Sequence, residues 1–73
     1  MTKEKAIELA RAYGEERGPI LDVKEYDDIF VVTFAKAWET YIVNRETEEV
    51  HHEQELTEEE SLAIAKRPYT ITR

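Results

Sequence analysis

The sequence predicts an α+β fold: an antiparallel meander of three to four strands with an N-terminal and a C-terminal helix, in two layers and in the order α-β-β-β(-β)-α. Two β-rich runs, Ile29–Phe34 and Thr40–Val43, lie in the middle of the chain. An amphipathic segment precedes these runs and another follows them. The length of 73 residues suits one domain, so residues 1–73 are expected to fold around a single core.

The first helix is predicted from an apolar stripe that follows a capping residue. Thr2 can accept a hydrogen bond from the first turn of the helix. Apolar side chains then recur at i, i+3, i+4 and i+7, at Ala6, Leu9, Ala10 and Tyr13. Gly14 suits the left-handed residue that ends many helices, and Gly18-Pro19 interrupts the chain before the first strand.

The central strand is predicted at Ile29–Phe34, because this run is apolar on both faces except at Thr33. A strand at Ile20–Tyr26 precedes it, and Asp27-Asp28 provides the turn between the two. We expect the helices to cover only one face of so small a sheet. The second face then needs a different cover, for which a long loop, the C-terminal segment Tyr69–Ile71 and a second copy of the chain in a homodimer are the alternatives.

The second half of the sheet is expected to consist of shorter elements. Asn44–Glu49 is a polar turn after the Thr40–Val43 strand. Val50–Leu56 is predicted as a polar edge strand and is the optional fourth strand of the meander. Thr57 and Glu60 have the spacing of a capping box, which predicts that a short second helix begins after Thr57.

Composition restricts the class of protein. The chain has no cysteine, so neither a disulfide nor a thiol nucleophile is available. It has no apolar run of signal-peptide or membrane-span length, and we therefore expect a soluble, cytoplasmic protein that does not bind membranes. The net charge of −7 argues against direct binding of nucleic acid, which needs clustered lysine and arginine.

The negative charge is concentrated in the residues Glu46–Glu60, which we call the acidic segment. It holds eight carboxylates and no lysine or arginine, whereas residues 1–45 carry nine acids against seven bases. Such a run is most often a solvated face that keeps a protein soluble. The alternative is a docking surface that attracts a basic partner by long-range Coulomb steering.

The sequence holds no recognisable catalytic or metal-binding motif. The one serine, Ser61, has no histidine at helical spacing, and no Gly-rich phosphate loop exists, so we expect neither an enzyme nor a bound cofactor. The adjacent His51-His52 pair would point to opposite faces of a strand and could not chelate one ion together. His51 would share its face with Glu49, Glu53 and Glu55, but this spacing matches no metal signature and no metal is expected.

Trp38 and Tyr41 are aromatic residues with two alternative roles. They flank a connection, Ala35–Glu39, that contains no glycine, proline, asparagine or aspartate to indicate its turn type. Both could extend a core that has little apolar mass, or they could be exposed anchors for a partner. The candidate partner-binding residues are Trp38, Tyr41, Glu49, His51, Glu53, Glu55 and Glu59.

Two stretches resemble bacterial PepSY domains. Lys3–Ala10, K-E-K-A-I-E-L-A, resembles the family's helix motif K-E-x-A-I-x-x-A. Tyr41–Val50, Y-I-V-N-R-E-T-E-E-V, resembles its late hairpin, roughly Y-x-V-D-x-x-T-G-E-V, with Asn44 at the aspartate and Glu48 at the glycine. Similar hairpins occur in small immunity-type proteins of bacterial toxin systems. The resemblance implies an α+β fold and a bacterial, non-enzymatic protein with a binding or inhibitory role, and it transfers no functional residue.

These features together predict a small acidic protein that binds a protein partner, basic in charge, through the acidic segment. The alternative is an immunity-type inhibitor or a nucleic-acid mimic that blocks a basic protein.

Overall fold

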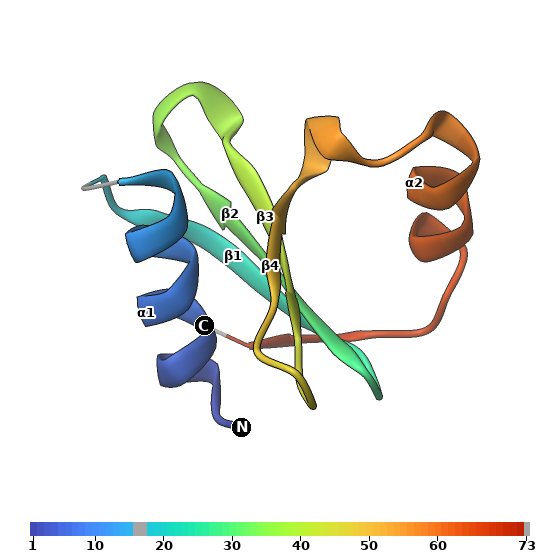
Figure 1. Cartoon of the computed structure of the whole chain (residues 1–73), viewed down its shortest axis with the longest axis horizontal. Helices are drawn as coiled ribbons and strands as arrows, with labels where there is room; N and C mark the ends of the chain where they lie inside the picture. Colours follow the sequence, from blue (N-terminus) through green and yellow to red (C-terminus); the bar gives the residue numbers. More distant parts are fainter. Residues whose placement is uncertain (16–17, 73) are drawn as a thin grey trace.

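The computed structural model describes residues 1–15 and 18–72 and confirms the α+β fold class. An antiparallel sheet is flanked by one helix from each end of the chain (Figure 1). The elements in chain order are α1 (Lys3–Gly14), β1 (Ile20–Glu25), β2 (Ile29–Phe34), the 3-10 turn η1 (Lys36–Trp38), β3 (Thr40–Asn44), β4 (Val50–His52), the 3-10 turn η2 (Glu53–Glu55), α2 (Glu58–Ala65) and β5 (Thr70–Thr72).

The sheet has the strand order β4-β3-β2-β1-β5, and every neighbouring pair is antiparallel. Strands β1 to β4 form the expected meander. The fifth strand, β5, was not predicted as a strand, and it pairs with β1 in the register Lys24↔Ile71. Three residues are too few to show a strand pattern in the sequence. The pairing of β5 with β1 depends instead on where the chain runs after the end of α2.

The face of the sheet that contacts α1 contains the main core. Its buried side chains have no more than 4% of their surface exposed, and they are Ala6, Ala10, Val23, Phe30, Val32, Phe34, Tyr41 and Val43. The small Ala6 and Ala10 let α1 lie close to the aromatic rings of the strands. Helix α1 and the sheet are therefore the two closely packed layers of the fold.

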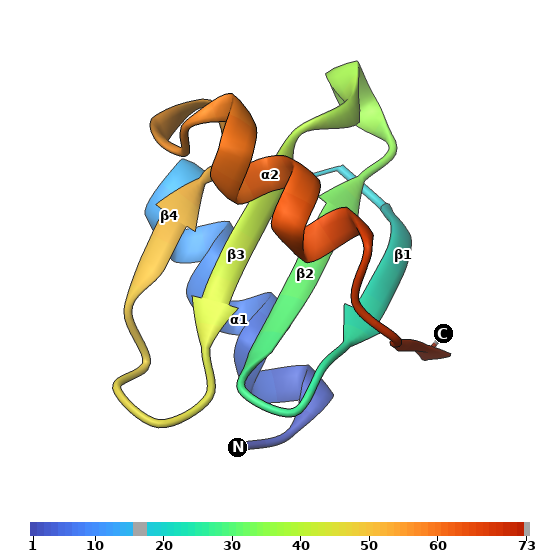
Figure 2. The same cartoon turned by 90° about the vertical axis from the view of Figure 1, so that its right-hand side faces the viewer.

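The second face of the sheet is covered by α2, which lies across β2 and β3 on the side away from α1 (Figure 2). The buried side chains here are Tyr26, Ile29, Val31 and Ile42, with Leu56 and Ile64 packed on them. The expectation that the helices cover a single face is therefore wrong. Ile64 of the second helix and Leu56 before it pack on this face, and Tyr69 of the C-terminal segment lies against Tyr26, with ring centroids 5.7 Å apart.

The end of α1 differs in detail from the expected one. Thr2 caps the start, where its hydroxyl accepts a hydrogen bond from the Lys5 amide. At the other end Glu15 takes the left-handed conformation (φ 55°) and Gly14 is the last helical residue. A Cβ on Gly14 would lie 2.0 Å from Oη of Tyr41, so glycine is needed here for the close approach of the ring rather than for a left-handed turn.

The region Val50–Leu56 is a strand only as far as His52. After His52 the chain forms η2, whose start is stabilised by a capping box. Nδ1 of His52 accepts a hydrogen bond from the Gln54 amide, and the Glu55 carboxylate accepts one from the His52 amide. These side chain–backbone bonds offer the backbone an alternative to the sheet ladder. The extended edge strand predicted through Leu56 is therefore wrong from Glu53 onward.

Two further local features involve the sequence motifs. The predicted capping box of the second helix is confirmed, since the Thr57 hydroxyl and the Glu60 carboxylate bond to each other's backbone amides. Glu48, which stands at the glycine position of the hairpin motif, has φ 63°, a conformation that glycine adopts at least cost. Within the described residues no helix is both long and apolar enough to cross a membrane.

Candidate binding surface

The carboxylates of the acidic segment lie along the β4 side of the molecule. Glu46, Glu48 and Glu49 occupy the turn between β3 and β4, Glu53 and Glu55 occupy η2, and the other three begin α2 (Figure 2). All eight are exposed. The segment therefore runs from one end of the edge strand to the other and continues onto the second helix.

The lysines and arginines that the structure describes form no ion pair with this segment. Where the structure describes both partners, the lysine and arginine ion pairs are Lys5–Glu8, Arg45–Glu25 and Arg67–Asp28, and none involves an acid between Glu46 and Glu60. The hydrogen bond from Arg67 lowers the pKa of Asp28, which favours the ionised pair. Within the described residues, the acidic segment is thus not offset by ion pairs with lysine or arginine.

His51 lies between two carboxylates of the acidic segment. Its Nε2 is 3.7 Å from Oε2 of Glu49 and its Nδ1 is 3.7 Å from Oε1 of Glu55. The second oxygen of Glu55 accepts hydrogen bonds from the Tyr13 hydroxyl at 2.6 Å and from the His52 amide at 2.7 Å. The bond from Tyr13 lowers the pKa of Glu55 and raises the pKa of Tyr13, because it favours the carboxylate and the protonated phenol.

His52 belongs to a different cluster on the α1 side of β4. Its ring packs edge-on against Tyr41, with centroids 5.0 Å apart, and its Nε2 contacts Oε2 of Glu39. Because Nδ1 accepts the Gln54 amide, the neutral ring carries its proton on Nε2 and donates it to Glu39. The two imidazoles thus have separate partners, and in the described part of the chain no three acidic or histidine side chains gather as a metal site.

Trp38 and Tyr41, which flank one connection, have opposite environments. Tyr41 is 4% exposed and lies in the α1-side core, where its ring packs edge-on against Phe34 and Tyr13. Trp38 is 71% exposed and has φ 55°, a conformation that is uncommon for a bulky residue. Of the two aromatic candidates, only Trp38 is accessible to a partner.

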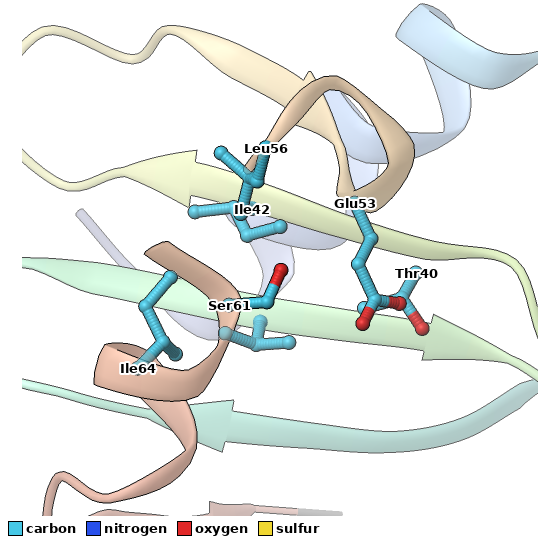
Figure 3. A pocket seen from close by; sticks show the side chains of 7 residues that line it. Thr40, Ile42, Glu53, Leu56, Ser61 and Ile64 are labelled. Carbon is cyan, nitrogen blue, oxygen red and sulfur yellow. The ribbon is translucent and has the colours of Figure 1, made fainter. Parts of the chain in front are cut away.

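Glu53 and Glu59 lie in different elements, Glu53 in η2 and Glu59 in α2. Glu59 points outward from the first turn of α2. Glu53 lines a hollow of about 50 Å³ between the sheet and α2, together with Val31, Thr40, Ile42, Leu56, Ser61 and Ile64 (Figure 3). The hollow has apolar walls and one polar rim, and the sequence did not predict it. One sequence feature is consistent with incomplete packing under α2: residues 62–65 are four consecutive apolar residues. Four consecutive residues of a helix cannot all face a sheet.

Ser61 lies in this hollow, half-buried on the sheet-facing side of α2. Its hydroxyl points toward Ile42 and away from Ile64 (Figure 3), and no histidine is among the described residues that line the hollow. The Ser–His arrangement that activates many nucleophilic serines is therefore not present among the residues that line the hollow. The hollow therefore offers hydrogen bonding and apolar contact, which are the elements of binding.

Comparison of the chain with protein-family models, curated proteins and solved structures finds no match. The resemblance to PepSY domains and immunity-type proteins stays a prediction.

Proposed function

We propose that this chain is a non-enzymatic, cytoplasmic protein-binding module whose acidic segment docks a basic protein. The observation that supports this most directly is that eight exposed carboxylates follow one side of the molecule without an ion pair to any described lysine or arginine. Charges left in water cost the fold little and attract an opposite charge over about 8–10 Å at physiological salt.

The exposed aromatic side chain lies at the same end of the sheet as η2. Trp38 sits in the connection between β2 and β3, and its carbonyl accepts a hydrogen bond from the Thr40 hydroxyl at 3.3 Å. Thr40 in turn lines the hollow beside Glu53. A partner held by the acidic segment could therefore bury Trp38 at the rim of the contact, and buried tryptophans contribute strongly at interfaces.

The distribution of the carboxylates along several elements favours a second candidate function: an inhibitor that imitates a nucleic-acid backbone. A mimic needs negative charges placed in sequence along a surface, and the acids run from the β3–β4 turn through η2 to the first turn of α2. The resemblance to immunity-type proteins fits the same role. In this case the partner is a nucleic-acid-binding protein, and DNA or RNA competes for the same site.

Charge reversal tests the proposed function. The variant combines Glu53→Lys, Glu58→Lys and Glu59→Lys, three acids without a partner in the described structure, and leaves Glu55, which caps η2. Binding of a fluorescent deca-lysine peptide is measured by anisotropy at low and at physiological salt. We expect the wild type to bind, with an affinity that falls steeply as salt rises, and the variant to lose at least tenfold in affinity.

The matched control reverses three acids outside the acidic segment, Glu4, Glu8 and Asp27, and so makes the same change in net charge. It should keep most of the affinity. An equal loss in both variants would show that net charge alone governs binding and would refute the acidic face. Proteins retained by the immobilised chain from its host's extract, and released by added DNA, would select the mimic over the simple binding module.

A further inference from the structure

The hollow between the sheet and α2 has the chemistry of a site for one cationic side chain. Its walls are the apolar side chains of Val31, Ile42, Leu56 and Ile64. One rim carries the Glu53 carboxylate and the hydroxyls of Thr40 and Ser61 (Figure 3). An apolar interior with a negative rim matches a ligand that has an aliphatic stem and a positive end.

The size of the hollow agrees with this ligand. A site needs roughly 10–15 Å³ of such free volume to hold one water molecule, so a volume of about 50 Å³ holds about four groups of that size. The lysine side chain has four methylene groups between its Cα and its ammonium. The stem would fill the hollow and the ammonium would stay at the rim.

Two of the three polar groups at the rim are free to accept hydrogen bonds, whereas the Thr40 hydroxyl already bonds to the Trp38 carbonyl and to the Thr33 hydroxyl. The carboxylate of Glu53 has no ion pair or hydrogen bond with any residue that the structure describes, and neither does the Ser61 hydroxyl. An ammonium is a compact charge with three donors that can turn toward acceptors of different kinds. The Glu53 carboxylate and the Ser61 hydroxyl supply such acceptors in the hollow.

We infer that the hollow receives a lysine side chain of the basic partner, with the stem against Val31, Ile42 and Ile64 and the ammonium beside Glu53. This inference rests on the proposed function and adds to it the residue type that is recognised and the place where it enters. The short α2 covers the hollow without burying any of its own residues, which allows a side chain to enter without breaking the main core.

The test uses butylammonium, which reproduces the lysine stem and charge, and 1-butanol, which has the same stem without charge. Each is titrated into methyl-labelled protein, and the NMR shifts of the Val31, Ile42, Leu56 and Ile64 methyl groups are followed. We expect saturable shifts with butylammonium, with a dissociation constant on the order of 10 mM for so small a probe. Butanol should bind roughly twofold to fivefold more weakly.

Two variants test whether the carboxylate that attracts butylammonium is that of Glu53. Glu53→Gln keeps the shape of the rim and should bring butylammonium down to the affinity of butanol. Glu59→Gln removes the same charge from a neighbouring position outside the hollow and should leave the affinity unchanged. Absent or non-saturating methyl shifts, equal binding of butanol, or equal effects of the two variants would each overturn the inference.

Ser61→Leu separates this inference from the proposed function, because the larger side chain fills the hollow and leaves all acids in place. We expect it to abolish the methyl shifts and to weaken deca-lysine binding at least threefold. If deca-lysine binds the wild type and Ser61→Leu equally well, the hollow is only imperfect packing and the acidic face survives. If deca-lysine binds neither protein, the proposed function fails together with the inference that rests on it.

Discussion

The two faces of the sheet are built from the same strands but packed very differently. On the α1 side, six buried side chains of the sheet, among them Phe30, Phe34 and Tyr41, pack with two buried alanines of α1, and their exposure does not exceed 4%. On the α2 side, four side chains of the sheet face are buried. No residue of α2 itself is buried, and a hollow remains between α2 and the sheet. Leu62 on α2 is 52% exposed.

This difference indicates a division of roles between the faces. Close packing on the α1 side supplies most of the hydrophobic stabilisation, which scales with the apolar area removed from water. The α2 side contributes less to stability and holds the open hollow, the unpaired Glu53 and the start of the acidic helix. Loosely packed elements are also the ones that can adjust to a ligand. The binding surface is thus on the side where the fold depends least on exact packing.

The largest expected effect comes from removing a core ring on the α1 side. Phe34→Ala deletes a side chain with 0% exposure and should destabilise the domain by about 3–5 kcal/mol, enough to unfold much of a protein this small. Ile64→Ala truncates a half-buried side chain on α2 and should cost only about 1 kcal/mol. Urea unfolding followed by circular dichroism measures both. Equal costs would contradict the division between the faces.

A smaller effect is expected from adding one methyl group at the α1–sheet contact. Gly14→Ala places a Cβ 2.0 Å from Oη of Tyr41, so the ring or the helix must move, at a cost of about 1–3 kcal/mol. Gly18→Ala is the control, since its Cβ would lie 3.2 Å from Cβ of Lys36. The loss of melting temperature should be larger at Gly14. A harmless Gly14→Ala would show that the α1 side tolerates change as readily as the α2 side.

The smallest effect concerns the bond that joins the two regions, from Tyr13 on α1 to Glu55 in η2. This bond lowers the pKa of Glu55 from 4.5, so its stabilisation is present above pH 4.5 and is lost as the pH falls through the lowered value. It raises the pKa of Tyr13 from 10.0, so the stabilisation is present below pH 10.0 and is lost as the pH rises through the raised value.

The corresponding variant is Tyr13→Phe, compared with the wild type by melting temperature across pH. The melting temperature of Tyr13→Phe should lie furthest below that of the wild type between pH 4.5 and pH 10.0. The difference should shrink at more acidic and at more alkaline pH. Tyr69→Phe is the control, because the Tyr69 hydroxyl has no hydrogen-bond partner among the described residues. A deficit that does not change with pH would mean that the bond does not couple η2 to α1.

Residues whose role depends on near neighbours in the chain were predictable. The Thr2 cap, the capping box of Thr57 and Glu60 and the apolar run Ile29–Phe34 are all visible as spacings in the sequence. The candidate surface was predictable in its charge and not in its shape. Glu53, expected on a strand face beside His51, lies in η2 at the rim of the hollow, since bonds between His52 and Glu55 end the strand first.

The sequence by itself determined the class of the fold, the meander of strands β1 to β4 and the position of the negative charge. These follow from side-chain periodicity, local capping and composition, which act over a few residues. Only the tertiary structure decided that the helices lie on opposite faces, that β5 pairs with β1, that Tyr41 is buried while Trp38 is exposed, and that a hollow forms beneath α2. These features depend on contacts between residues far apart in the chain, and such contacts leave no period in the sequence.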